Sequence, residues 1–145
     1  MEQFKVQHYL SAHPGSSFPE FQHLAEGDAT VLRCGLLGRC GLDQALSPLD
    51  LVRTIRGRQQ PIVQMNAESS EFRLDVAVAA VGVQPRPSVY INWNRYDDID
   101  EIGFADLAQQ FHDIWYPSSD DIDLFDASLA WIFSIDHDGY LSVLS

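Results

Sequence analysis

The segment Asp121–Leu144, DIDLFDASLAWIFSIDHDGYLSVL, decides the fold, because apolar and polar side chains alternate along short stretches separated by turn residues. Alternation with a period of two is typical of β-strands that bury one face. The expected strands cover residues 121–125, 129–136 and 140–144. Strands that follow one another through short turns pair in order. The sequence therefore predicts a three-stranded antiparallel meander at the C-terminal end.

The register of the last two strands follows from the side chains that must share the buried face. These side chains are Phe133, Ile135, Leu141 and Val143. They share a face only when Asp136 lies opposite Tyr140, whereas a two-residue turn would place them on opposite faces. We therefore expect a three-residue turn over residues 137–139, with Gly139 in the left-handed conformation.

Further strands and helices are expected upstream of this meander. Alternation predicts strands over residues 62–65, 72–79 and 89–93, and residues 30–32 form a weaker strand candidate. Helices are expected over residues 17–26, where Ser17 and Glu20 have capping-box spacing, and over residues 48–57, where Pro48 takes the first helical position. The clearest helix covers residues 103–115, with an apolar stripe at helical spacing. Together these patterns predict a single α+β domain over residues 1–145, with two to three helices packed on an antiparallel sheet.

The composition is that of a globular protein, with 46% hydrophobic and 21% charged residues. No apolar run approaches the roughly 20 residues that a membrane-spanning helix needs. The first residues, Met1 to Lys5, lack the basic and apolar regions of a secretory leader. We therefore expect a cytoplasmic protein.

Charge is distributed unevenly along the chain. Residues 1–96 contain nine acidic and nine basic side chains, whereas residues 97–145 contain twelve acids and no Lys or Arg, so the last third carries the whole net charge of −12. Nucleic acid and anionic membranes are poor partners for such a surface. A cation or a basic protein surface is a good partner.

Two segments of this acidic third place tyrosine beside several carboxylates, a composition expected where a basic protein docks. The candidate partner-binding residues are Tyr96, Asp97, Asp98, Asp100, Glu101, Tyr116, Asp120, Asp121 and Asp123. Trp93 and Trp115 lie on the apolar faces of their elements, so we expect both in the core. If the acidic third only solubilises the protein, the interface would lie on residues 1–96. Its next candidates would then be Arg33, Arg39, Arg56 and Arg58.

From the sequence we expect no bound metal, no cofactor and no catalytic activity. The acids at positions 120, 121, 123 and 126 alternate along a strand, so they do not converge by default, and a solvated acidic strand face is the favoured interpretation. His137, between Asp136 and Asp138, is more typical of a polar turn than of an acid–base site. Cys34 and Cys40 are separated by five residues, which is not common zinc-site spacing, and structural thiols are favoured over zinc or redox roles.

The stretch from Phe111 to Asp126, FHDIWYPSSDDIDLFD, with Trp131 and the turn at residues 137–139, resembles the C-terminal part of small acidic bacterial immunity proteins. Such proteins are encoded beside polymorphic toxins, including those of contact-dependent growth inhibition. The resemblance covers about the last quarter of the chain. It implies a cytoplasmic protein that binds and blocks one cognate toxin, often a basic nuclease.

The charge supports the same hypothesis independently, because a nuclease surface must be basic to hold phosphates and an acidic inhibitor is steered towards it. The alternatives are a metal-assisted hydrolase that uses clustered aspartates and a structural or adaptor subunit of a secretion system. Carboxylates spread over an open face would favour binding. Carboxylates that meet in a cleft with His137 or His112 would favour catalysis.

Overall fold

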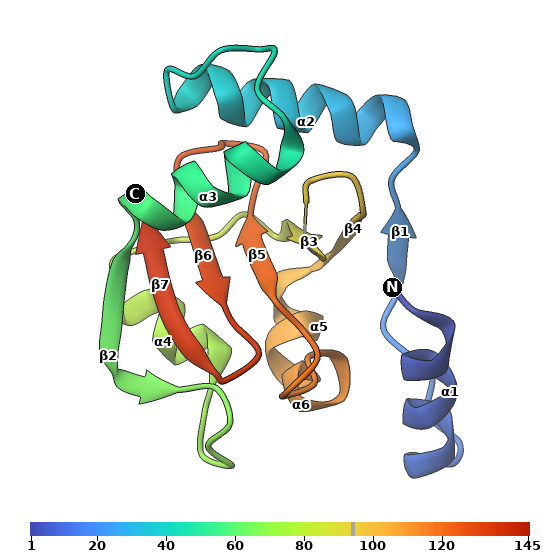
Figure 1. The fold of residues 1–145 in the computed structure, drawn as a ribbon. Coiled ribbons are helices and arrows are strands. Elements are labelled where there is room, and N and C mark those ends of the chain that lie inside the picture. Colours follow the sequence, from blue (N-terminus) through green and yellow to red (C-terminus); the bar gives the residue numbers. More distant parts are fainter. Residues whose placement is uncertain (94) are drawn as a thin grey trace.

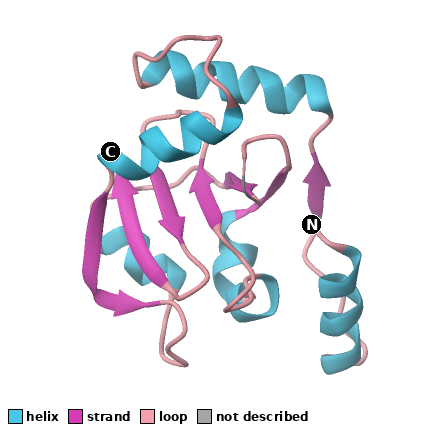
Figure 2. Ribbon diagram, viewed as in Figure 1, coloured by secondary structure: helices cyan, strands magenta, loops and turns pink. Residues whose placement is uncertain are grey.

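The computed structural model describes residues 1–93 and 95–145 and contains a seven-stranded antiparallel sheet with the strand order β1-β4-β3-β5-β6-β7-β2 (Figure 1; Figure 2). The strands are β1 (Phe21–His23), β2 (Gln60–Asn66), β3 (Ser88–Asn92), β4 (Ile99–Gly103), β5 (Ile122–Phe125), β6 (Ile132–Ile135) and β7 (Tyr140–Leu144). The helices among these residues are α1 (Gln3–Ala12), α2 (Glu26–Arg39), α3 (Pro48–Arg58), α4 (Leu74–Ala80), α5 (Phe104–Gln109) and α6 (Phe111–Ile114).

Helices cover both faces of the sheet, so two cores form. On one face, α2 and α3 pack Leu36, Leu51 and Ile55 against the sheet. On the other face, α4, α5 and α6 cover the larger core around Ile91 and Phe133. Helix α1 lies near the β1 edge of the sheet, below β1 in the view, and contacts α6 (Figure 1).

The C-terminal meander and its register are confirmed. Strands β5, β6 and β7 pair in sequence, with Phe133 opposite Val143 and Ile135 opposite Leu141. Asp136 therefore faces Tyr140, and the backbone N–H of Asp136 donates to the Tyr140 carbonyl at 3.1 Å. The turn over residues 137–139 leaves Gly139 with a φ of 75°, as its left-handed position requires.

Substituting this glycine is expected to destabilise the fold. In Gly139→Ala the new Cβ would clash with Asn66 Oδ1 and would lie 2.9 Å from the Glu68 backbone nitrogen. Left-handed backbone also costs a non-glycine residue roughly 1–2 kcal/mol, so we expect urea denaturation to show a loss of about 2 kcal/mol or more. Gly82→Ala is the matched control, because Gly82 has the same φ of 75° with open space around its Cβ position. Equal losses in both variants would contradict the close packing of this turn.

Three local predictions upstream of β3 are wrong. Residues 72–79 were expected as a strand but enter helix α4, because Leu74, Ala77 and Val78 also match helical spacing and bury one helix face. Residues 17–26 were expected as a helix but contain the short strand β1, and residues 30–32 belong to α2 rather than to a strand. Helix α2 begins with Glu26 and Asp28 in its first turn, where acids interact favourably with the helix dipole.

The remaining elements agree in part. Helix α3 begins after Ser47, whose Oγ accepts the Asp50 backbone N–H at 3.2 Å, as its capping position predicts. The helix expected over residues 103–115 is broken at Gln110 into α5 and α6. The predicted α+β class with an antiparallel sheet is confirmed, with six helices among the described residues where two to three were expected. Strand β4 was not predicted, because Asp100 and Glu101 interrupt its apolar pattern.

Candidate functional site: an acidic pocket

The two acidic segments singled out by composition meet at one cavity of about 530 Å³, which we call the acidic pocket. It lies between α1, β1, the end of β3 and the loop that precedes β5. Its lining residues are Met1, Glu2, Phe4, His23, Trp93, Asp98, Ser119, Asp120 and Asp121. Carboxylates far apart in the sequence thus share one wall with two aromatic side chains.

Asp120 lines this pocket and connects α1 to the rest of the protein, which we call the body. Its carboxylate binds the ammonium group of Lys5, whose side chain is fully buried. Oδ2 of Asp120 also accepts the backbone N–H of Tyr116 at 2.7 Å, and its carbonyl accepts Nε1 of Trp115 at 2.9 Å. These bonds fix the loop that presents Asp120 and Asp121.

Asp100 lies beneath the pocket. It is fully buried in β4, where it accepts Nε1 of Trp93 at 2.6 Å and the amino group of Met1. His23 lies opposite it across the β1–β4 pair, with Nδ1 at 3.0 Å from Oδ1 of Asp100. The carboxylate thereby orients Trp93 and His23, both of which line the pocket.

The predicted site residues fall into three groups. Asp97 and Asp98 are exposed, and Glu101, Tyr116 and Asp121 are half-buried. Asp120 is 8% exposed but lines the pocket. The remaining three are Tyr96, Asp100 and Asp123, which are buried. These three side chains were expected at the surface, and the structure places them in the interior instead.

Asp123 is buried because it belongs to a row of polar side chains that crosses the sheet beneath α3. It accepts Nδ2 of Asn92 at 3.0 Å and the hydroxyl of Ser134. Gln59 continues the row, donating to Ser134 Oγ at 2.5 Å and accepting the hydroxyl of Ser142 at 3.0 Å. The expected solvated acidic strand face is therefore wrong for Asp123, which is held in the interior by hydrogen bonds.

Tyr96 is fully buried in the core beneath α2 and α3, where its ring lies 6.0 Å from that of Phe125. Burial raises the pKa of Tyr96 well above its usual value, and the nearby carboxylate of Asp123 adds to this effect. The backbone N–H of Tyr96 donates to the Asn92 side chain at 2.7 Å. This tyrosine therefore lies in the core beside the loop that carries Asp97 and Asp98.

Of the acids at positions 120, 121, 123 and 126, the first two line the acidic pocket, whereas the last two have separate buried partners. Asp121 accepts both the backbone N–H and Nδ1 of His137 at 3.0 Å. The hydrogen bond that His137 donates to Asp121 raises the pKa of His137. Asp126 instead accepts Nε1 of Trp131 at 3.2 Å and is buried.

One group of metal-ligating atoms was missed by sequence spacing. Nδ1 of His23 and oxygens of Asp98 and Asp100 lie within 4.8 Å of one another, because β1 pairs with β4. His23 Nδ1 lies 3.8 Å from Asp98 Oδ1. However, Asp100 already accepts three nitrogen donors, so a metal ion would have to displace some of them.

Trp93 and Trp115 were both expected in the core, and the two differ in burial. Trp115 is buried and stacks on Phe111 with ring centroids 5.6 Å apart. Trp93 is half-buried, packs partly against the larger core and lines the acidic pocket. The structure thus adds Trp93, Phe4 and His23 to the candidate site.

No protein-family model matches this chain, and neither curated proteins nor solved structures give a match. Among the described residues, no helix has both the length and the apolar character needed to span a membrane. We therefore infer the chemistry of the site from its geometry. Carboxylates beside half-exposed Phe4 and half-buried Trp93 have the chemistry to hold a cationic group.

Proposed function

We propose that this chain is an inhibitor of the immunity-protein kind, which acts in the cytoplasm by binding a basic toxin domain at the acidic pocket. The observation that carries this proposal is the meeting of Asp98 with Asp120 and Asp121 around one cavity of about 530 Å³. Residues 97–145 contain no Lys or Arg that could neutralise these carboxylates from within the same third of the chain.

The pocket has the chemical features that an inserted lysine or arginine requires. Asp98 is exposed and Asp121 is half-buried, so both can pair with a partner cation. Phe4 is 49% exposed and Trp93 is half-buried, so their rings can contact the aliphatic stem or the charged head of such a side chain. A toxin that binds nucleic acid would carry such cations on its own active surface.

Association with the toxin should depend strongly on salt. Exposed charges are screened beyond about 8 Å at physiological ionic strength, so electrostatic steering weakens as salt rises. We expect the association rate with a basic toxin domain encoded beside this chain to fall by roughly tenfold or more between low and high salt. Stopped-flow kinetics would measure this rate. A tight complex whose association rate ignores salt would contradict the proposal.

A metal-assisted hydrolase is the second candidate, and the convergence of His23, Asp98 and Asp100 favours it. The donors already bound to Asp100 favour a positioning role instead, so we expect elemental analysis of protein purified without chelator to show no stoichiometric zinc, manganese or calcium. A tightly held equivalent that His23→Ala abolishes would support the hydrolase and displace the inhibitor proposal.

A further inference from the structure

Lys5 is the single lysine of the chain, and its side chain is fully buried. Its Nζ lies 4.5 Å from the ring centroid of Trp93 and 4.7 Å from that of Tyr116. It donates to the Ile114 carbonyl at 2.9 Å and pairs with the carboxylate of Asp120. Aromatic faces combined with a carboxylate and a carbonyl oxygen are the features that recognise an ammonium group.

We call the residues around this ammonium group the cation cage: Trp93, Ile114, Tyr116 and Asp120. All four come from the body of the protein, between the end of β3 and the start of β5. Two hydrogen bonds that do not involve Lys5 hold the cage, since the Tyr116 backbone N–H donates to the Asp120 carboxylate and the Trp115 indole donates to the Asp120 carbonyl. The body of the protein thus forms the cage, and Lys5 of α1 occupies it.

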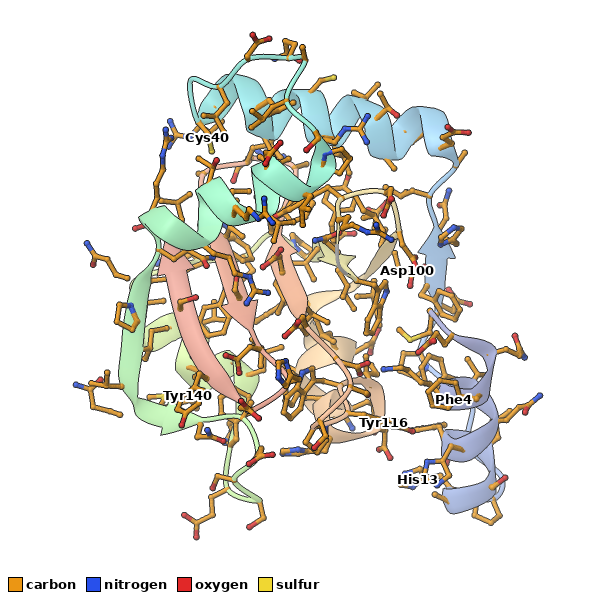
Figure 3. The ribbon with its side chains drawn as sticks, in the orientation of Figure 1. Phe4, His13, Cys40, Asp100, Tyr116 and Tyr140 are labelled. Carbon is orange, nitrogen blue, oxygen red and sulfur yellow. The ribbon has the colours of Figure 1, made fainter. Side chains whose placement is uncertain are left out.

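Helix α1 is attached to the body through few buried groups. Lys5 and Tyr9 are its only buried residues, whereas Phe4 and Leu10 are 49% and 44% exposed. Its N-terminus has no side-chain cap. Figure 3 shows α1 beside the body, with Phe4 and Tyr116 facing each other across the junction, and their rings lie 5.9 Å apart. Lys5 therefore supplies a buried ion pair between this helix and the body, whereas the pair of His13 with Asp113 at the helix end is partly exposed.

We propose that the cation cage is a binding site for a lysine side chain of the partner, and that Lys5 occupies it in the free protein. The inference rests on the proposed function, because the partner is the same basic toxin domain. Trp93 and Asp120 belong to both the cage and the acidic pocket, so the two sites are continuous. A partner ammonium that replaces Lys5 keeps the Asp120 ion pair intact, which avoids leaving a buried charge alone.

This exchange makes Lys5 a competitor of the partner. A site that its own chain occupies most of the time binds more weakly, in proportion to the fraction that is open. Lys5→Gln should therefore bind the toxin domain more tightly, by about tenfold, whereas Lys5→Arg keeps a competing cation and should bind as the wild type does. If Lys5 served only to position α1 as a wall of the pocket, Lys5→Gln would bind more weakly, and that result would overturn the inference.

The cage itself can be tested without any partner. In Lys5→Ala the site is open to n-butylammonium, which has the same four-carbon stem and charged head as lysine. We expect n-butylammonium chloride to raise the melting temperature of this variant by roughly 2–4 °C above sodium chloride of equal ionic strength. n-Butanol should not do so, and wild-type protein should show no such difference. The response should disappear in Lys5→Ala/Asp120→Asn. An equal response to sodium chloride, or an unchanged response in the double variant, would overturn the inference.

The wild-type protein provides a second measurement that does not depend on the folding of a variant. Because Lys5 is the single lysine, mass spectrometry can follow its acetylation by an amine-reactive ester. We expect Lys5 to react slowly in the free protein and about tenfold faster when the toxin domain is bound. If Lys5 reacted just as slowly in a complex saturated with the toxin domain, the proposed replacement of Lys5 by a partner lysine would be overturned. Failure of the toxin domain to bind at all would count against the proposed function. The n-butylammonium result would still show whether the cage binds an ammonium group.

Discussion

Truncating Phe133 to alanine is expected to lower the free energy of unfolding by about 3–5 kcal/mol, as buried aromatic truncations do. Phe133 is fully buried in β6 and lies opposite Leu124 of β5 and Val143 of β7. Its removal leaves a cavity in the centre of the larger core, which the surrounding strands cannot close without breaking their ladders. Urea denaturation followed by circular dichroism would measure the loss.

Tyr140→Ala is the control for this variant. Tyr140 belongs to the same hairpin but is 66% exposed, so its truncation should change stability by no more than about 0.5 kcal/mol. A larger loss in Tyr140→Ala than in Phe133→Ala would mean that the faces of the hairpin are reversed. The register that aligns Asp136 with Tyr140 would then be wrong.

The meander could be predicted because its signals are local and agree with one another. Alternation in β6 and β7 identifies the buried face, and Gly139 supplies the left-handed residue that the three-residue turn needs. Helix α4 could not be separated from a strand in this way. Its seven residues, Leu74 to Ala80, are too few for periodicity to decide, and packing on the larger core selected the helix.

The candidate site could be predicted only in part. Composition identified Asp98, Asp120 and Asp121, which line the acidic pocket. It treated every carboxylate as exposed, although Asp100 and Asp123 are buried by partners on neighbouring strands. Those partners become visible only when the strand pairing is known.

The walls of the pocket depend on contacts between distant parts of the chain. Lys5 and Asp120 are separated by 115 positions, and His23 and Asp100 by 77. No local spacing relates these residues. Only the tertiary structure therefore shows that helix α1 and strand β1 belong to the site, although their residues carry two of its cationic or titratable groups.

Binding of the toxin domain by a pocket variant tests the central claim most directly. Asp98→Asn/Asp121→Asn removes two charges from the pocket while keeping side-chain oxygens that can accept hydrogen bonds. Asp43→Asn/Glu71→Gln removes the same charge from exposed positions outside the pocket, and it is the matched control. Calorimetric titration of each variant would give the dissociation constant at one fixed salt concentration.

We expect the pocket variant to lose about 2–5 kcal/mol of binding free energy, because carboxylates that pair with a desolvated cation carry much of an interface's energy. The control variant should bind within about threefold of the wild type, since distant exposed charges contribute only weak steering. Equal, near wild-type affinity in both variants would contradict the acidic pocket as the binding site. The interface would then have to lie elsewhere, with Arg33, Arg39, Arg56 and Arg58 as the next positions to substitute.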